Sequence, residues 1–432
     1  MTIGIDISAL QSAHRMRGIG FTVLNFINHI SDKDREKHRF VFFMFKSDLN
    51  NPVRLLKLDG MNYEIRYLTE KKLAQKTSPI GRLQRLIKST IRQLGELKDR
   101  YIGSSITKDL KGIDVFIQPD QSQNLPRKWG LRKVLIVYDI IPYVLEWEYL
   151  WSYSTARTRG YSRKAALRCT ARRWLYLKKL KINARRADLM LAISEQTKID
   201  FINFVGASPK KIEITHLGVS PVEGDDEPPS LLRYEKTSWG YLAKPFKHDL
   251  GTPYLLYVGG ADRRRKLEDL ITAFNALRAE GVKIKLFLTG DTMQGPENIA
   301  TEEIQGSLRS SSYLGDIVFL GFTDDKTRDW LYKHALAFVY PSTYEGFGLP
   351  VLEAMAHKCP VICYKNGAVV EVAGTVPLYT KRSVGIRKEV RSLLSSNNSK
   401  TKSLVENGAS QAAKFSWSKT SNSIFQIIEK RS

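Results

Sequence analysis

Short apolar runs alternate with helix-like stretches along nearly the whole chain. In the first half, runs such as TIGIDIS (residues 2–8) and KVLIVYDII (133–141) are almost continuously hydrophobic. Strands of this kind are typical of parallel sheets whose two faces are both covered by helices. The second half repeats the pattern in PYLLYVGG (253–260) and LAFVYPS (336–342). The sequence therefore predicts an α/β protein with two doubly wound sheets.

The length of the chain and one composition shift predict the domain boundaries. A chain of 432 residues exceeds what a single core usually supports. Residues 221–250 are rich in proline, glycine and charge, which is typical of a linker. We therefore expect an N-terminal domain over 1–220, a C-terminal domain over 251–415 and a C-terminal helix over 416–432. The site is expected between the two domains.

Cysteine usage and hydropathy predict the compartment. Cys169, Cys359 and Cys363 form an odd set without a C-x-x-C pair, which favours a reduced chain. No apolar run approaches the roughly 18 residues that span a bilayer. The first residues read as a strand and not as a signal peptide. We expect a soluble cytoplasmic protein. No G-x-x-x-x-G-K-[ST] loop is present, which argues against an ordinary NTPase.

The stretch EGFGLPVLE (345–353) places two carboxylates around a tight turn. Pro350 suits the first turn of a helix, because its missing N–H would have no partner there. Residues 346–348 then precede a helix N-terminus, where backbone N–H groups and the helix dipole bind anions. Glu345 and Glu353 are poor phosphate ligands but good acceptors for sugar hydroxyls. The stretch predicts a site for a sugar attached to a phosphate; the alternative is a surface turn with two solvated acids.

A cationic run follows the glycine pair at residues 259–260. Arg264, Arg265 and Lys266 stand just before a predicted helix. A departing nucleoside diphosphate builds negative charge in the transition state, and fixed cations stabilise that charge. Since the cations can neutralise the leaving group, no metal is required. The alternative is a solvated helix start. We consider it weaker, because cations at a helix N-terminus oppose the dipole and need a compensating anion.

EGFGLPVLE resembles the E-x7-E signature of retaining glycosyltransferases with the GT-B architecture, especially glycosyltransferase family four. Other segments are also similar to that family: YLLYVGGADRRRKLEDLITAF (254–274), residues 187–220, GIDISALQSAHRMRGIGFTVLNFI (4–27), VYDIIPYVLEWEYL (137–150) and FSWSKTSNSIFQII (415–428). The resemblance implies two Rossmann-like domains facing each other across a cleft, with the C-terminal helix returning to the N-terminal domain.

The resemblance also implies roles for individual residues. Glu353 would bind the nucleotide ribose, while Glu345 and the glycine loop would contact the transferred sugar. Arg264 and Arg265 would hold the diphosphate. The catalytic candidates are Glu345, Arg264, Arg265 and Asp139. The donor-binding candidates are Gly18, Gly20, Lys266, Gly346, Phe347, Gly348, Leu349, Glu353 and Tyr138.

The chain departs from the family pattern at three places. Arg265-Lys266 stands where the family usually has Lys-Asn, so charge is kept while geometry changes. Tyr138 precedes Asp139 where many members have a histidine that contacts the sugar. Lys358 replaces a common glycine, which affects helix termination.

The N-terminal half carries most of the positive charge. Residues 1–220 contain 40 Lys/Arg against 20 Asp/Glu, whereas the remainder contains 28 against 24. Residues 71–95 contain no acid and predict an amphipathic helix. Residues 151–186 carry twelve Lys/Arg, no acid and several aromatic residues. This pattern favours an anionic membrane surface over nucleic acid, for which no base-reading motif is present. General solubility, with the aromatic side chains packed inward, is the third interpretation.

These observations together predict a retaining hexosyltransferase with a UDP- or GDP-linked sugar donor. Its acceptor would be a saccharide, lipid-linked, in bacterial surface polysaccharide (O-antigen or capsule) biosynthesis, on the cytoplasmic face of the cell membrane. No cofactor and no metal are expected: Asp32-Lys33-Asp34 has the D-x-D spelling of metal-dependent glycosyltransferases but lies in a charged run typical of a solvated turn. The alternative function is a catalytically inactive GT-B subunit that binds or chaperones a glycosyltransferase complex.

Overall fold

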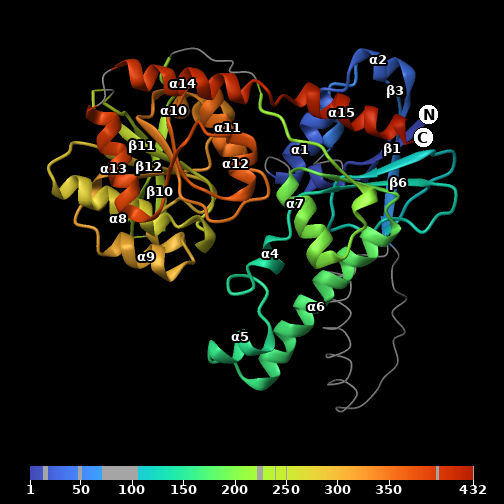
Figure 1. Ribbon diagram of the computed structural model, residues 1–432, viewed down its shortest axis with the longest axis horizontal. Coiled ribbons are helices and arrows are strands. Elements are labelled where there is room, and N and C mark those ends of the chain that lie inside the picture. The colour runs from blue at the N-terminus through green and yellow to red at the C-terminus, as the bar shows by residue number, and fades with distance from the viewer. Residues whose placement is uncertain are drawn as a thin grey trace. The chain divides into compact units, whose positions relative to one another are not determined.

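The computed structural model describes residues 1–12, 18–46, 51–70, 106–220, 227–238, 240–249, 251–395 and 398–431. The predicted amphipathic helix at 71–95 lies outside these residues. The chain forms two compact units (Figure 1). The first comprises Met1–Leu217 and Trp417–Ser432, and the second comprises Gly218–Ser416.

An eight-stranded sheet forms the centre of the first unit. Its strand order is β4-β3-β2-β1-β5-β6-β7-β8, and every neighbouring pair is parallel except β3–β4. The strands are β1 (Thr2–Asp6), β2 (Arg39–Phe45), β3 (Asn62–Glu70), β4 (Ile106–Thr107), β5 (Val115–Gln118), β6 (Arg132–Val137), β7 (Leu189–Ala192) and β8 (Ile212–Ile214). The direction of the order reverses between β1 and β5, as in a doubly wound sheet.

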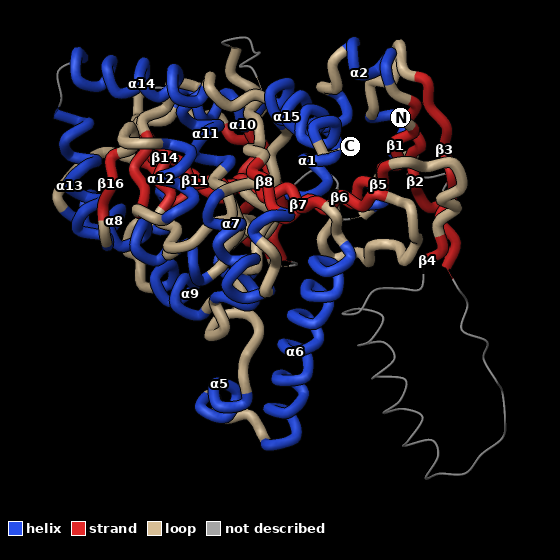
Figure 2. The backbone as a smooth tube through the Cα atoms, turned by 45° about the vertical axis from the view of Figure 1, so that its right-hand side comes forward, coloured by secondary structure: helices blue, strands red, loops and turns tan. Residues whose placement is uncertain are grey.

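The helices of the first unit pack on this sheet or extend away from it (Figure 2). They are α1 (Gly18–Asn28), α2 (Asp32–Lys37), α4 (Ile141–Val144), α5 (Tyr153–Thr158), α6 (Arg163–Arg186), α7 (Glu195–Asp200) and α15 (Trp417–Lys430), with short helical turns at Ser8–Gln11, Pro52–Leu55, Phe201–Val205 and Pro209–Lys211. The core lies against the sheet, where the rings of Phe43 and Phe116 meet edge to face at 5.6 Å. Aromatic pairs of this geometry add to the gain from apolar burial.

The C-terminal helix α15 packs against α1 of the first unit. Phe425 stacks on Phe26 with 6.0 Å between ring centroids, and Trp417 meets Phe21 at 5.7 Å. The Thr420 hydroxyl donates to the His216 carbonyl at 2.8 Å. These contacts confirm the prediction that the C-terminal helix returns to the N-terminal domain. The buried aromatic face of the helix supplies the reason.

The second unit is built on a six-stranded, fully parallel sheet. Its order is β13-β12-β11-β14-β15-β16, which in chain order reads 3-2-1-4-5-6, the Rossmann arrangement. The strands are β11 (Tyr254–Val258), β12 (Lys285–Thr289), β13 (Ile317–Gly321), β14 (Ala337–Tyr340), β15 (Val361–Tyr364) and β16 (Leu378–Thr380). Because the order reverses between β11 and β14, the carboxyl ends of these two strands open the crevice where such sheets bind ligands.

The helices of the second unit are α8 (Leu267–Ala279), α9 (Glu302–Arg309), α10 (Asp325–His334), α11 (Leu349–Ala356), α12 (Gly367–Ala373), α13 (Arg382–Ser395) and α14 (Asn398–Ala412), with short turns at Arg263–Arg265, Pro296–Asn298 and Leu314–Asp316. Several begin with a side-chain cap. Asp324 accepts from Thr327 N at 2.7 Å at the start of α10, and Asn366 accepts from Val369 N at 3.1 Å at the start of α12. Such caps fix where a helix begins.

An antiparallel hairpin occupies part of the predicted linker. Its strands are β9 (Leu231–Thr237) and β10 (Gly240–Phe246), and both belong to the second unit. Tyr234 lies over Gly321, and Tyr241 lies over Gly295. The structure thus has a hairpin of the second unit at Leu231–Phe246, within the range 221–250 where the sequence predicts a linker. Charged side chains alternate there with aromatic ones that pack on the second unit.

Candidate active site

Two loops meet at the carboxyl ends of β11 and β14. The first leads from Gly259 into the arginine turn Arg263–Arg265, and the second carries Glu345 and ends where α11 begins. Thr343 joins them, since its N–H and its hydroxyl both donate to the Arg264 carbonyl, at 2.9 and 3.0 Å. Asn366 steadies the second loop by donating to the Ser342 carbonyl at 3.0 Å. Residues about eighty positions apart in sequence thus form one site.

The Glu345 carboxylate lies at the centre of this site and is buried. Its Oε1 accepts from the Tyr340 hydroxyl at 2.6 Å and the Ser342 hydroxyl at 2.8 Å, and it also pairs with Arg264. Arg265 Nε lies 3.5 Å away. Burial raises the pKa of Glu345, but Arg264 and Arg265 outweigh burial, and the net pKa lies below the ordinary value. Glu345 is therefore an anion in the folded protein.

Within the described residues, only one oxygen of Glu345 makes contacts with the protein. Each of its hydrogen bonds and ion pairs goes to Oε1, and no described residue donates to Oε2. An ionised carboxylate can accept at both oxygens. Oε2 can therefore accept from a hydroxyl of a bound molecule, which is the contact that the sequence predicts for Glu345.

Arg265 depends on the backbone of Gly259. That glycine has φ +152°, and a Cβ built there would lie 2.2 Å from Arg265 Nη1. Only glycine therefore leaves room for the guanidinium beside the strand end. Burial lowers the pKa of Arg265, but neighbouring groups, among them Glu345, raise it further, so the guanidinium stays charged.

Every cation of the run 263–266 has a carboxylate partner. Arg263 pairs with Glu303, Arg264 with Glu345, and Lys266 with Glu268 at 3.5 Å. The compensating anions that the sequence analysis expects beside these cations are therefore, in the described residues, carboxylates of the protein itself. Arg265 Nε lies farther from Glu345 Oε1 than Arg264 does, at 3.5 Å, so Arg264 makes the closer ion pair with this carboxylate.

Lys266 adopts a left-handed backbone conformation. Its φ is +45°, which is uncommon for a residue with a side chain. Asparagine tolerates this region better than lysine. Lysine at this position therefore places backbone strain directly before α8.

Glu353 lies in α11 and is held by α10. Its Oε2 accepts from the Tyr332 hydroxyl at 3.1 Å, and Arg328 Nε lies 3.8 Å from the same oxygen. Burial lowers the pKa of Arg328, but Glu353 and other neighbours raise it above the ordinary value. As with Glu345, no described residue donates to the second oxygen. Neither Arg328 nor Tyr332 was predicted, because nothing in their local sequence distinguishes them from other residues of an amphipathic helix.

The glycine loop 346–348 leads into α11. Gly348, with φ +106°, stands at the N-cap, and Pro350 occupies the first turn as predicted. Leu349 begins the helix. Phe347 is buried, and its ring lies 6.2 Å from that of Phe415. Its side chain therefore belongs to the core, so only its backbone is suited to the predicted contact with a sugar.

The remaining predicted residues belong to the first unit. Gly18 and Gly20 stand in the first turn of α1, and Gly18 has φ +53°. Tyr138 follows β6 and is buried, which raises the pKa of its phenol. Asp139 Oδ1 accepts from Ile141 N at 3.0 Å in the turn that leads into α4. Gln121 fixes this turn, because it accepts from Tyr138 N at 2.9 Å and donates to the Asp139 carbonyl at 2.5 Å.

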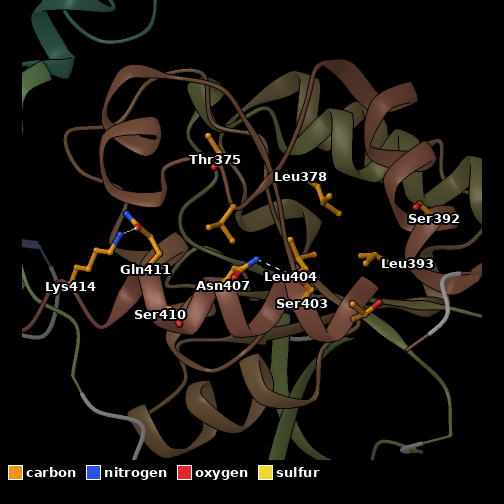
Figure 3. Close-up of a pocket in the computed structure, with 12 residues that line it drawn as sticks. Thr375, Leu378, Ser392, Leu393, Ser403, Leu404, Asn407, Ser410, Gln411 and Lys414 are labelled. Carbon is orange, nitrogen blue, oxygen red and sulfur yellow. Dashed lines mark hydrogen bonds between the residues drawn. The ribbon is translucent and has the colours of Figure 1, made fainter. Parts of the chain in front are cut away.

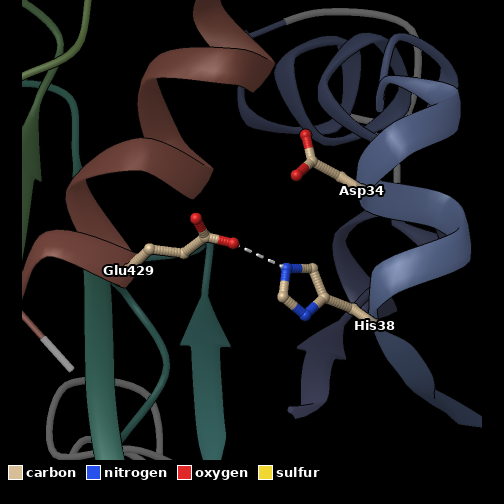
Figure 4. A group of neighbouring side chains, drawn as sticks. All are labelled: Asp34, His38 and Glu429. Carbon is tan, nitrogen blue, oxygen red and sulfur yellow. Dashed lines mark hydrogen bonds and ion pairs between the residues drawn. The ribbon is translucent and has the colours of Figure 1, made fainter.

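One group among the described residues has the composition of a metal site. It consists of Asp34, His38 and Glu429 (Figure 4). His38 Nε2 lies 3.1 Å from Glu429 Oε1, and Lys37 Nζ lies 2.6 Å from the same oxygen. A cation of the protein already occupies this carboxylate, and the contacts tie α15 to α2. The Asp32-Lys33-Asp34 sequence lies in α2 itself, with Asp34 hydrogen-bonded to Ser31 at 2.6 Å.

A cavity of about 680 Å³ lies elsewhere in the second unit (Figure 3). Leu378, Leu393, Leu404, Asn407 and Gln411 are among its lining residues. None of the predicted site residues lines it. Its position between α13 and α14 separates it from the carboxyl ends of β11 and β14, so it is not the candidate site.

The architecture is that of GT-B glycosyltransferases, with two Rossmann-like domains. The structure of Anabaena Alr3699/HepE in complex with UDP and glucose aligns with this chain with a TM-score of 0.61 at 15% identity, covering 100% of both chains. Residues 242–410 match the family model described as glycosyl transferases group 1. This range contains the arginine turn, Glu345 and Glu353.

Two Escherichia coli proteins are among the relatives in sequence. The O-antigen chain mannosyltransferase B is 28% identical over 237 residues, which are 54% of this chain and 58% of that protein. The serotype-specific mannosyltransferase WbdA is 26% identical over 255 residues, which are 58% of this chain and 29% of that protein. The chain thus spans between about a third and three fifths of these relatives. No helix in the described parts of the chain has the length and apolar character needed to cross a membrane.

Proposed function

We propose that this protein is a retaining glycosyltransferase of family four that transfers a hexose from a nucleoside diphosphate to a saccharide acceptor. The observation that carries this proposal is the pair of carboxylates at the switch point of a Rossmann sheet. In the part of the chain that the structure describes, Glu345 and Glu353 each use one oxygen for protein contacts, which leaves the other for hydroxyls of a bound molecule. The arginine turn stands beside Glu345.

In the proposed complex each group has a separate task. Glu353 accepts from the ribose, and Glu345 Oε2 accepts from the transferred sugar. Arg265 and Lys266 neutralise the diphosphate, with Arg264 holding Glu345 in place. As charge develops on the departing diphosphate, these fixed cations stabilise the transition state more than the ground state. The N-terminus of α11 adds its dipole on the same side.

The reaction proposed is a front-face substitution. The bond from the anomeric carbon to the diphosphate oxygen breaks, and the acceptor hydroxyl oxygen bonds to the same face. The acceptor proton passes to a phosphate oxygen, and the nucleoside diphosphate leaves. This route needs no nucleophile from the protein and no metal. Gly18, Gly20, Tyr138 and Asp139 are proposed to complete the site from the N-terminal domain.

The relatives direct the choice of substrates. Both E. coli relatives are mannosyltransferases, so mannose is the first sugar to test, with GDP- and UDP-linked donors compared. O-antigen appears in the name of one of them, and we propose a lipid-linked saccharide acceptor in bacterial surface polysaccharide biosynthesis. The protein would work in the cytoplasm on the inner face of the membrane, held there by its basic N-terminal domain. A catalytically inactive binding subunit is the second candidate, favoured only by the departures at Tyr138 and at 265–266.

The test is a donor screen that measures released UDP or GDP in the presence and absence of saccharide acceptors. Glu353→Ala and Arg264→Ala should each remove most sugar transfer, while circular dichroism shows an intact fold. Glu406→Ala and Arg309→Ala serve as matched controls in the same unit and should retain activity. Unchanged turnover in both site variants would reject the assigned roles. Donor binding without product in the natural chain would favour the inactive subunit.

A further inference from the structure

Helix α6 is longer than the sheet that it crosses. It has 24 residues, which at 1.5 Å per residue extend about 36 Å. It connects β6, of six residues, to β7, of four, and six residues of strand extend only about 20 Å. Because a crossover helix runs antiparallel to the strands, about 16 Å of α6 projects beyond the carboxyl edge. Figures 1 and 2 both show α6 reaching away from the sheet, with α5 at its far end.

Side-chain burial differs between the part of α6 beside the sheet and the part that projects beyond it. Near its C-terminal end, Lys179, Leu180, Asn183 and Ala184 are buried. Between residues 163 and 178 only Ala166 is buried. There α5 packs against α6, where Ala156 is fully buried. This part of α6 is therefore supported by α5 and by Arg173, which donates to the Tyr143 and Leu150 carbonyls, while most of its other side chains are exposed or half-buried.

Exposed apolar side chains lie among cations along the first two thirds of α6 and in the segment that precedes α5. Trp147 is 57% exposed, Leu167 61% and Trp174 56%. Leu167 and Trp174 are seven residues apart, so they share one face of α6. We call the following set the α5–α6 surface: Trp147, Tyr153, Tyr161, Lys164, Leu167, Arg168, Arg172, Trp174 and Lys178.

All charged side chains within α5 and α6 are cations. Residues 151–186 contain no acid, and Lys178 Nζ lies 4.3 Å from the centroid of the Trp174 ring. Glu146, just before this segment, is held by Arg173 at 3.3 Å. Tryptophan and tyrosine are enriched at water–lipid interfaces, because their rings contact lipid while their polar groups stay hydrated. Cations beside them match an anionic headgroup layer.

We propose that the α5–α6 surface docks on an anionic lipid bilayer, with Leu167 and Trp174 entering the headgroup region and the cations contacting lipid phosphates. The value of this contact to the cell rests on the proposed function, since a lipid-linked acceptor is presented at that surface. The phosphates of a nucleic acid could also pair with these cations. A nucleic acid has no apolar layer that the exposed Leu167 side chain could enter, whereas a bilayer has one.

The test is sedimentation of the full chain with phosphatidylcholine vesicles that contain 0 to 40% phosphatidylglycerol. Binding should rise steeply with the anionic fraction and fall with salt. A Lys or Arg near such a surface contributes roughly fivefold to binding. Arg168→Glu with Lys178→Glu should therefore weaken binding by at least about 25-fold. Leu167→Ala with Trp174→Ala should weaken it about tenfold at unchanged charge.

Matched controls lie outside the α5–α6 surface. Trp129 is 98% exposed but stands at the amino end of β6, the opposite edge of the sheet. Lys402 is 74% exposed in α14 of the second unit. Trp129→Ala and Lys402→Glu should each change binding by less than twofold. Lipid brominated near the headgroup should quench part of the tryptophan fluorescence of the bound protein. The Trp174→Phe variant should lack this quenched part, because it comes from Trp174.

Three outcomes would overturn the proposal. The first is equal loss in the control variants, and the second is no loss in either α5–α6 double variant. The third is displacement of the vesicles by a short duplex DNA that binds more tightly at the same salt, which would assign the surface to nucleic acid. Vesicle binding is measured without donor or acceptor. Its failure therefore leaves sugar transfer to water-soluble acceptors intact, whereas failure of sugar transfer leaves vesicle binding measurable.

Discussion

A double-mutant cycle on Arg264 and Glu345 tests the centre of the candidate site. The single changes are Glu345→Gln, which keeps shape and removes charge, and Arg264→Met. Both side chains are less than 10% exposed. Removing one partner of a buried pair costs about 3–5 kcal/mol, because the other charge remains buried without compensation. Arg264→Met leaves Glu345 with Arg265, Tyr340 and Ser342, so we expect its cost at the lower end of that range.

The double variant should cost clearly less than the sum of the two single variants. We expect a coupling free energy of about 2–4 kcal/mol. The exposed pair Lys402–Glu406 provides the matched control, since its atoms are 4.0 Å apart and both side chains are more than half exposed. Exposed pairs one helical turn apart are coupled by only about 0.3–0.5 kcal/mol.

The assay must report on the second unit alone. A chain with two units does not unfold in a single two-state step, so a global melting curve is unsuitable. Native-state hydrogen exchange of the peptide that contains β14 measures local stability beside Glu345. A coupling free energy below about 0.5 kcal/mol, equal to that of the control pair, would refute the interpretation of Arg264 and Glu345 as a buried pair.

Three smaller predictions concern backbone strain and pH. Gly259→Ala should cost about 1–3 kcal/mol of stability and reduce donor turnover, because its Cβ meets Arg265. Gly306→Ala in α9, where a Cβ would have nothing within 4 Å, should stabilise the second unit by about 0.5–1 kcal/mol. Equal effects of the two variants on hydrogen exchange would contradict this. Lys266→Asn should relieve left-handed strain and raise local stability by several tenths of a kcal/mol, and a loss in the same assay would count against strain there. Burial lowers the pKa of His38, so as pH falls below about 6.5 the histidine of the unfolded chain takes up a proton before that of the folded chain. Stability then decreases by at most about 1.4 kcal/mol per pH unit. His38→Gln should flatten this pH dependence of stability, measured by hydrogen exchange of α15, and an unchanged slope would exclude His38 as its source.

The fold could be predicted to a large extent because its signals are local. Continuous apolar runs mark buried parallel strands, and both predicted sheets are present. The hairpin at β9 and β10 was missed, since its polar alternation and prolines resemble those of a linker. Tyr234 packs on Gly321 of β13 and Tyr241 on Gly295 in the loop after β12, and both partners are far away in sequence.

The site could be predicted only in its parts. The sequence indicates Glu345, Glu353 and the arginine run as functional, but it does not show that Glu345 is the anion that compensates Arg264 and Arg265. That pairing depends on the 3-2-1-4-5-6 strand order, which makes β11 and β14 neighbours. Arg328 and Tyr332, one turn apart in α10, become recognisable only because α10 faces α11.

The separation of the two carboxylates, with seven residues between them, follows from this geometry. Glu345 is fixed in the loop by Tyr340 and Ser342, and the chain then turns at Gly348, where a left-handed residue is required. From that point each helical residue rotates the next side chain by about 100°. One residue more or fewer would turn Glu353 away from Tyr332 and would expose the buried face of α11. The spacing is therefore the one that directs both carboxylates to the carboxyl edge of the sheet while α11 remains packed.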